Sequence, residues 1–452
     1  MRRVLVISLP GVGWRDVDAD RTPNLAGLFR VSALANLSTR APTLRTDLAG
    51  GYVTFGAGDK AVGPATLDAG EAFGVDEPFG AGTAGEAFRR RTDDSVSQGI
   101  VHLGIEAIRS ANATSLWEAD VGVLGAALDA GGFRGAVIAN ADLDTAEMIE
   151  PIVTSPYHRE AAAALMDPRG VVGAGRVDPA LLRRDPNAPF GARLAPEAVR
   201  RAFSDVFTDG SVVLVEGSDI VRADAYAAGQ TPDARMSLRA DALGWTDDLV
   251  GLLMEQVDLE RDAVLVMGPA PSPRDRRALT VVALHAPGFT GGLLRSPTTQ
   301  RSGYVQLMDL APSVLDVVGI ERPDSMRGRP VAQSGGGTLT QRRATLVDSD
   351  RAARFRAEIR DPLALGFVAA EILLAAAAVI VLARSQSRGR RALVVAARAI
   401  LGLVVAVFLA RLVPFHDIGA GAYFAFVVAL GVGIGSAVGL VGRRDRIDPT
   451  IA

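Results

Sequence analysis

Short, continuous apolar segments alternate along the first 330 residues with longer segments that have a helical period. The apolar runs indicate strands, at residues 4–9, 135–139, 211–215, 263–267 and 279–284. Recurrence of apolar residues every three or four positions indicates helices, at residues 116–130, 196–207, 240–257 and 304–318. Strands that are apolar on both faces and alternate with helices are typical of parallel sheets. We therefore predict an α/β domain at residues 1–330, with a mostly parallel sheet covered by helices on both faces.

Three longer apolar segments follow near the carboxyl terminus, at about residues 363–383, 392–413 and 420–441. Each has about 20 residues, the length that a helix needs to cross a bilayer. Glu371 and Arg398 interrupt the first two segments. They could pair with each other, mark a transport path, or lie at a helix interface or near a headgroup. We predict a membrane domain at residues 361–452, with the lipid bilayer as its partner.

A glycine face marks the third of these segments, because Gly431, Gly435 and Gly439 recur at every fourth residue. Such a face suits close helix packing. It could pack against the other helices of the same chain or support self-association. Between the two domains, residues 331–360 contain a Gly-rich stretch, expected to be a flexible joint, and then an Arg-rich stretch, expected to be a juxtamembrane helix.

Arginines set the predicted orientation of the spans. They are frequent in the first short loop, at residues 384–391, and after the third span, at residues 443–446, whereas the loop at residues 414–419 has none. The positive-inside rule then places the carboxyl terminus in the cytoplasm and the large domain outside. Arginines at residues 351–360 oppose this orientation, and no export signal precedes the first strand. Either the true start of the chain lies upstream, which we favour, or the large domain is cytoplasmic.

Composition narrows the possible functions. The net charge is −3, and the segment from Arg384 onward carries nine arginines against three aspartates, so the rest of the chain is acidic. An acidic domain argues against a nucleic-acid partner. The chain has no cysteine, which excludes disulfides and thiolate metal sites, and its four histidines (His102, His158, His285 and His416) limit metal chemistry.

Several sequence blocks of the large domain occur in an order found in a known family. The first strand ends in a turn at Leu9-Pro10-Gly11, and Thr22-Pro23-Asn24-Leu25 follows. Residues 46–58 combine a Thr-Asp start with a glycine-rich end, and residues 304–315 and 326–330 close the domain. In this order the blocks resemble the alkaline phosphatase superfamily, over residues 3–330. The resemblance implies a two-metal site at which a Ser or Thr attacks phosphorus.

The resemblance also implies metal ligands that this chain largely lacks. Pro10 stands where the family has its first Asp, Ala223 replaces a ligand four residues after Asp219, and residues 267–271 offer none where the family has an Asp-His pair. Asp219, Asp224 and His285 are the remaining candidates, which is too few for two metals. Asp219 and Asp224 could instead cap strand ends or pair with Arg222, and His285 could be a structural histidine.

Thr46 is the candidate nucleophile that the resemblance implies. It could equally be a helix N-cap, because Thr before Asp47 suits a helix start. His158 follows Ser155 and Pro156, and we expect it to be solvated in a loop.

These observations predict a multi-pass membrane protein with a catalytically inactive alkaline phosphatase-like domain. It would bind or scaffold an envelope component or another membrane protein at the bacterial cell envelope, and no cofactor is expected. The alternative is a metal-dependent phosphoester hydrolase or transferase. In that case Thr46 would be the nucleophile, and zinc, manganese or magnesium would be held by Asp219, Asp224 and His285, together with Asp47.

Overall fold

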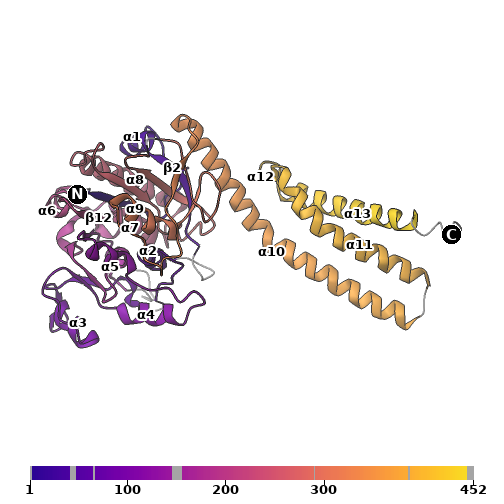
Figure 1. The fold of residues 1–452 in the computed structure, drawn as a ribbon, viewed down its shortest axis with the longest axis horizontal. Helices are drawn as coiled ribbons and strands as arrows, with labels where there is room; N and C mark the ends of the chain where they lie inside the picture. Colours follow the sequence, from indigo (N-terminus) through magenta and orange to yellow (C-terminus); the bar gives the residue numbers. More distant parts are fainter. Residues whose placement is uncertain are drawn as a thin grey trace. The chain divides into compact units, whose positions relative to one another are not determined.

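The chain forms two compact units, Met1–Val347 and Asp348–Ala452 (Figure 1). The computed structural model describes residues 3–40, 47–64, 67–144, 155–289, 291–384 and 387–444. The α/β elements belong to the first unit, and the apolar helices belong mainly to the second.

A ten-stranded sheet forms the centre of the first unit, in the order β17-β15-β16-β2-β14-β13-β1-β12-β7-β9. β1 (Val4–Ser8) lies between β13 (Ala263–Met267) and β12 (Ser211–Glu216) and runs parallel to both. β14 (Thr280–His285) runs antiparallel to its neighbours β13 and β2 (Ala33–Ser38). The remaining strands are β7 (Arg134–Ile138), β9 (Ala174–Arg176), β15 (Leu293–Arg295), β16 (Tyr304–Gln306) and β17 (Ala332–Ser334). The predicted fold class, a mostly parallel sheet, is confirmed.

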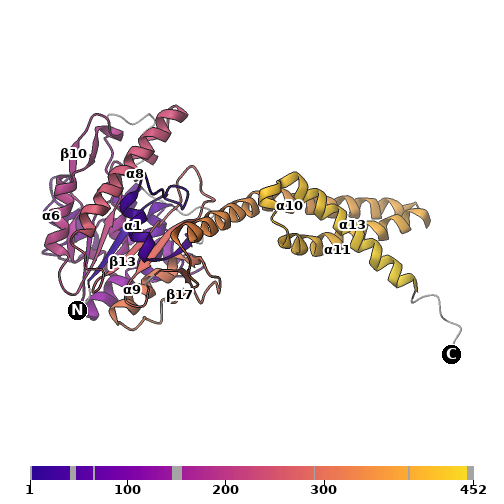
Figure 2. The same cartoon turned by 90° about the horizontal axis from the view of Figure 1, so that it is seen from above.

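Helices cover both faces of this sheet. Val4 and Val6 of β1 belong to one hydrophobic core, and the alternating residues Leu5 and Ile7 belong to the other. The first face carries α2 (Leu48–Ala57), α5 (Val123–Ala130) and α9 (Leu310–Val318). The second face carries α1 (Pro23–Val31), α6 (Pro196–Val206) and α8 (Pro232–Met254). Figure 2 shows α8 and α9 on opposite sides of β13.

α2 lies close to the backbone of its neighbours because glycine occupies its contact positions. A β-carbon at Gly51 would lie 2.2 Å from the carbonyl oxygen of Pro269, and one at Gly56 would lie 2.7 Å from that of Ala163. Gly58 ends the helix in the left-handed conformation, with φ of 60°. The glycines therefore fix where the amino terminus of α2 meets the edge of the sheet.

Two predicted helices are shorter than the apolar pattern indicated. α5 begins at Val123, and not at residue 116, because Gly122 adopts a φ of 79° before it. The segment predicted as a helix from residue 304 begins with β16, which pairs with β2, and only then becomes α9. In both places tertiary contacts or backbone conformation outweigh the helical period.

α10 (Leu339–Ala383) is one continuous helix of 45 residues that begins on the first unit. Arg342 fixes its first turns, since the buried guanidinium donates to the carbonyl oxygens of Ser32 (2.6 Å) and Arg30 (2.9 Å). The Gly-rich stretch predicted as a joint is thus followed by helical turns that pack on the same domain.

Among the residues that the structure describes, three helices are long and apolar enough to cross a membrane, namely α10, α11 (Ser387–Leu409) and α13 (Ala420–Arg444). α11 and α13 run side by side (Figure 1). A β-carbon at Gly431 would meet Leu403, and one at Gly435 would meet the backbone of Ala399. The glycine face is therefore packed against α11 of the same chain.

Candidate functional site

A cleft of about 430 Å³ opens where the central parallel strands end. Pro10 and Gly11 follow β1, and Ala270 and Pro271 follow β13. The amide of Gly11 donates to the carbonyl oxygen of Ala270 at 2.8 Å, so the two loops are joined through their backbones. The start of α2, with Asp47, and α7 (Ser218–Tyr226), with Asp224, complete this part of the wall.

Apolar side chains occupy the positions at which the family resemblance implies metal ligands. Pro10, Ala270 and Pro271 all line the cleft, and none of them carries an atom that can bind a metal through its side chain.

Arginines engage the two aspartates that the sequence suggested as ligands. Asp219 is buried, and its carboxylate accepts from the amide of Leu194 at 2.9 Å and from the guanidinium of Arg222. Asp224 accepts from Arg239 Nη1 at 2.6 Å, and the same guanidinium donates to the carbonyl oxygen of Gly11 at 2.7 Å. Of the two aspartates, Asp224 is the one that lines the cleft.

His285 lies at the opposite end of the central strands, away from the cleft. β14 is antiparallel to β13, so Thr280 contacts Gly268 beside the cleft, whereas His285 is in register with Val264 near the start of β13. The imidazole contacts the carbonyl oxygens of Val31 and Leu259, each at 3.0 Å. The structure therefore does not bring His285 together with Asp219 and Asp224.

Thr46 lies outside the described residues. The N-cap role that we considered for it belongs to Asp47, whose carboxylate accepts from the amide of Gly50 at 2.7 Å. Asp47 thus satisfies one of the free amides at the start of α2.

His158 and Glu160 face the cleft as a hydrogen-bonded pair. His158 Nδ1 lies 2.9 Å from Glu160 Oε1, and the two side chains are 21 % and 8 % exposed. Burial opposes protonation of His158, but the adjacent Glu160 carboxylate outweighs it, so the pKa of His158 is raised above its ordinary value. His158 Nε2 and Glu160 Oε2 are buried without a partner in the described part of the chain. The expectation of a solvated His158 is wrong.

Arg159 holds this pair in place. Its side chain is 1 % exposed, and its guanidinium binds Glu77 at 2.8 Å and Asp142 at 2.7 Å. These partners come from other parts of the chain, so the local sequence around His158 does not indicate that this segment is buried.

A further buried network lies behind α2. Glu216, at the end of β12, accepts from Tyr52 Oη at 2.6 Å and from Ser218 Oγ at 2.5 Å. Tyr52 Oη lies 2.7 Å from Ser8 Oγ, and since the tyrosine donates to Glu216, the serine donates to the tyrosine. Burial raises the pKa of Glu216 to about 7, although hydrogen bonds from Ser218 and Tyr52 oppose the rise. Sequence reasoning missed this group, because a single Glu that ends an apolar strand gives no functional signal.

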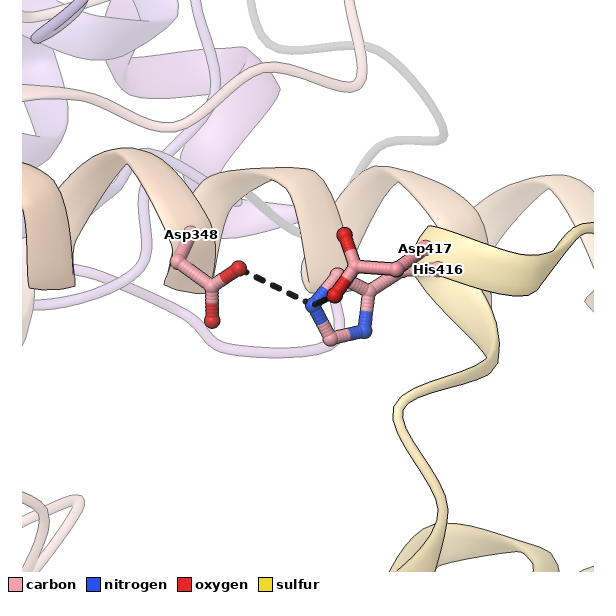
Figure 3. A group of neighbouring side chains, drawn as sticks. All are labelled: Asp348, His416 and Asp417. Carbon is pink, nitrogen blue, oxygen red and sulfur yellow. Dashed lines mark hydrogen bonds and ion pairs between the residues drawn. The ribbon is translucent and has the colours of Figure 1, made fainter.

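The described residues of the cleft do not fit a two-metal site, which needs about five or six carboxylate and imidazole ligands. In the described ranges, three such groups come within 4.8 Å of one another only in the second unit, at Asp348, His416 and Asp417 (Figure 3). There His416 Nε2 lies 3.0 Å from Asp348 Oδ1, and Arg351 Nη1 lies 3.1 Å from Asp417 Oδ1. Both aspartates are about half exposed.

No protein-family model matches the chain, and no curated protein matches it. Similar solved structures include the PH0037 protein from Pyrococcus horikoshii, with 15 % identity over 71 % of this chain and 98 % of that chain and a TM-score of 0.39. They also include the lipoteichoic acid synthase LtaP from Listeria monocytogenes (13 % identity, 72 % and 74 % covered, TM-score 0.39). A protein in the alkaline phosphatase superfamily from Vibrio parahaemolyticus is a third (11 % identity, 73 % and 69 % covered, TM-score 0.38). A member of the superfamily that the sequence blocks resemble is thus among the similar structures.

Proposed function

We propose that this protein is a membrane-anchored binding protein whose alkaline phosphatase-like domain does not hydrolyse its ligand. The observation that supports this most directly is the wall of the cleft, in which Pro10, Ala270 and Pro271 stand where metal ligands are implied. A proline or alanine side chain offers no oxygen or nitrogen to a cation.

The carboxylates that remain are held by the chain's own cations. A metal at Asp219 would have to displace the buried Arg222, and one at Asp224 would have to displace Arg239. Breaking a buried ion pair by removing one partner costs about 3–5 kcal/mol. Metal affinity at Asp219 would fall accordingly, by two orders of magnitude or more, and the fall at Asp224 would be smaller because Arg239 is partly exposed.

The membrane helices define where such a protein would act. We place the large domain on the outer side of the bacterial membrane and the carboxyl terminus in the cytoplasm, following the arginines of the loops. The ligand of the cleft would then be an envelope component or an exposed part of another membrane protein.

Metal analysis and hydrolysis assays of the purified full-length protein test this proposal. We expect far less than one equivalent of zinc, manganese or magnesium, and hydrolysis of 4-nitrophenyl phosphate and 4-nitrophenyl sulfate no faster than by a Thr46→Ala variant. Two bound metals together with turnover that Thr46→Ala abolishes would refute it. An authentic alkaline phosphatase carried through the same purification controls for loss of metal.

One observation favours the alternative, a hydrolase or transferase with an unusual ligand set. His158 and Glu160 line the cleft together with Asp47 and Asp224, and the buried atoms His158 Nε2 and Glu160 Oε2 lack partners in the described part of the chain. His158 Nε2 and Glu160 Oε2 could supply two ligands to a divalent cation, beside which Thr46 would be the nucleophile. Under this alternative, His158→Ala and Glu160→Ala would each lower metal content and turnover, and His285→Ala would change neither.

A further inference from the structure

Glu371 and Arg398 lie deep inside the apolar segments 363–383 and 392–413, in which the third ionisable residue, Arg411, lies near the end of the second segment. Ionisable groups inside a bilayer are rare, and they usually face a partner or a water-filled cavity. In the part of the chain that the structure describes, neither residue makes a hydrogen bond or an ion pair. Each therefore needs a partner that the isolated chain does not supply.

The spanning part of α10 is left uncovered by the rest of its unit. None of its most apolar 18-residue window is buried, and Glu371 is exposed. α10 meets the α11–α13 hairpin earlier along its length, where Phe355, Ile359 and Leu363 pack in a cluster with Phe415 and Tyr423. Lipid can cover the exposed leucines and valines of this span, but it cannot satisfy a carboxylate.

Arg398 lies on the hairpin itself. A β-carbon at Gly439 of α13 would lie 2.9 Å from Arg398 Nη1, and one at Gly435 would lie 2.7 Å from the carbonyl oxygen of Arg398. The glycines of α13 thus leave room for a guanidinium beside the hairpin. They are occupied by α11 and are not themselves available to a second helix.

The two charges lie at the same depth. Glu371 is about three helical turns before the end of α10 at Ala383, and Arg398 is about three turns after the start of α11 at Ser387. Both ends face the same short loop, so each charge is roughly 16–18 Å from that side. Two copies related by an axis along the membrane normal would keep the two charges level.

We propose that two copies of the chain associate in the membrane with α10 of one copy against α11 of the other, so that Glu371 and Arg398 pair across the interface. The symmetry generates two such pairs, and the interface has no net charge. The uncovered face of α10 and the complementary charges at equal depth favour a second copy as its occupant. The inference concerns the membrane unit alone and holds whatever the cleft binds.

Charge reversal in trans tests the proposal on the full-length protein. Because the chain lacks cysteine, Ala452→Cys gives a single labelling site, and energy transfer between labelled copies in phosphatidylcholine vesicles reports association. Glu371→Arg alone and Arg398→Glu alone should each weaken dimerisation by about tenfold or more, since like charges then face each other. Mixing the two variants should restore it, because both interfacial pairs again join Glu and Arg.

Pairing within one chain gives a different result, since mixing two broken chains repairs neither. Absence of rescue in the mixture would overturn the proposal, and so would energy transfer that is absent in the parent protein or unchanged in both single variants. Glu358→Arg, an exposed charge reversal outside the spans, should leave association unchanged. If a reversed charge prevents insertion, Glu371→Ala and Arg398→Ala replace it, and each should also weaken association about tenfold.

Discussion

Glu216 should make the stability of the first unit depend on pH near neutrality. The folded chain raises the pKa of this buried carboxyl to about 7, from an ordinary value of 4.5. Between these two values the folded state holds a proton that the unfolded state releases. The free energy of unfolding therefore falls as the pH rises from about 4.5 to 7, and Glu216 causes no further fall above that range.

The size of this loss follows from the same two values. The interval between them corresponds to about 3 kcal/mol, because each tenfold change in proton affinity contributes about 1.4 kcal/mol. Glu216→Gln removes the titrating group and keeps a carbonyl oxygen for one of the donors, Tyr52 or Ser218. The variant should lose part of the hydrogen-bond network at every pH, but its stability should not show the loss of about 3 kcal/mol between pH 4.5 and 7.

Tryptophan fluorescence during urea unfolding can measure this, because Trp14, Trp117 and Trp245 all lie in the first unit. His158 also titrates with a raised pKa, but Glu160 and Asp142 raise it more than Glu216 does, so the difference between the two profiles reports mainly Glu216. Asp205→Asn, which changes an exposed carboxyl on α6, should follow the parent profile. Parallel profiles for the parent and Glu216→Gln would refute the reasoning.

Two packing predictions can be measured in the same assay. Gly51→Ala should destabilise the first unit by about 1–3 kcal/mol, because its β-carbon would meet the carbonyl oxygen of Pro269. Gly244→Ala has open space around its β-carbon and should be neutral or stabilising. Equal effects of the two substitutions would contradict the close approach of α2 to Pro269. Arg159→Met should lower the free energy of unfolding by about 3–5 kcal/mol, because it leaves two partly buried carboxylates unpaired. Arg109→Met, which removes a surface ion pair, should lower it by at most about 1 kcal/mol. A similarly small effect of Arg159→Met would show that its ion pairs do not hold the segment in place.

The central strands could be predicted from the sequence because both faces of each are buried. β13 was predicted with the bounds that the structure has, and β1, β12 and β14 within one residue. β2 was missed, since Asn36 interrupts its apolar run while pairing with Leu346 of α10, far along the chain. β16 was read as part of a helix, because its three residues extend the period of α9 and only their pairing with β2 makes them a strand.

The site was harder to predict because its parts meet only through the fold. Pro10 and Ala270, which lie where the resemblance implies metal ligands, both line the cleft. The resemblance could not show that β14 is antiparallel, and this reversal is what carries His285 to the other edge of the sheet. The His158–Glu160 pair could not be predicted for a similar reason. The neighbouring Arg159 is buried and binds Glu77 and Asp142, and no local sequence pattern connects these carboxylates to it.

Two arginines at the carboxyl ends of the strands link separate segments of the chain, as a bound metal ion would. Arg239, on α8, binds Asp224 of α7 and the carbonyl oxygen of Gly11 after β1. Arg222 binds Asp219 and the carbonyl oxygen of Asn140 after β7. A guanidinium has a fixed charge, several donors and no vacant coordination position, so it can hold these loops but cannot lower the pKa of a bound hydroxyl or water as a metal does. The cleft can therefore keep a defined shape without bound metal, as the binding role that we propose requires.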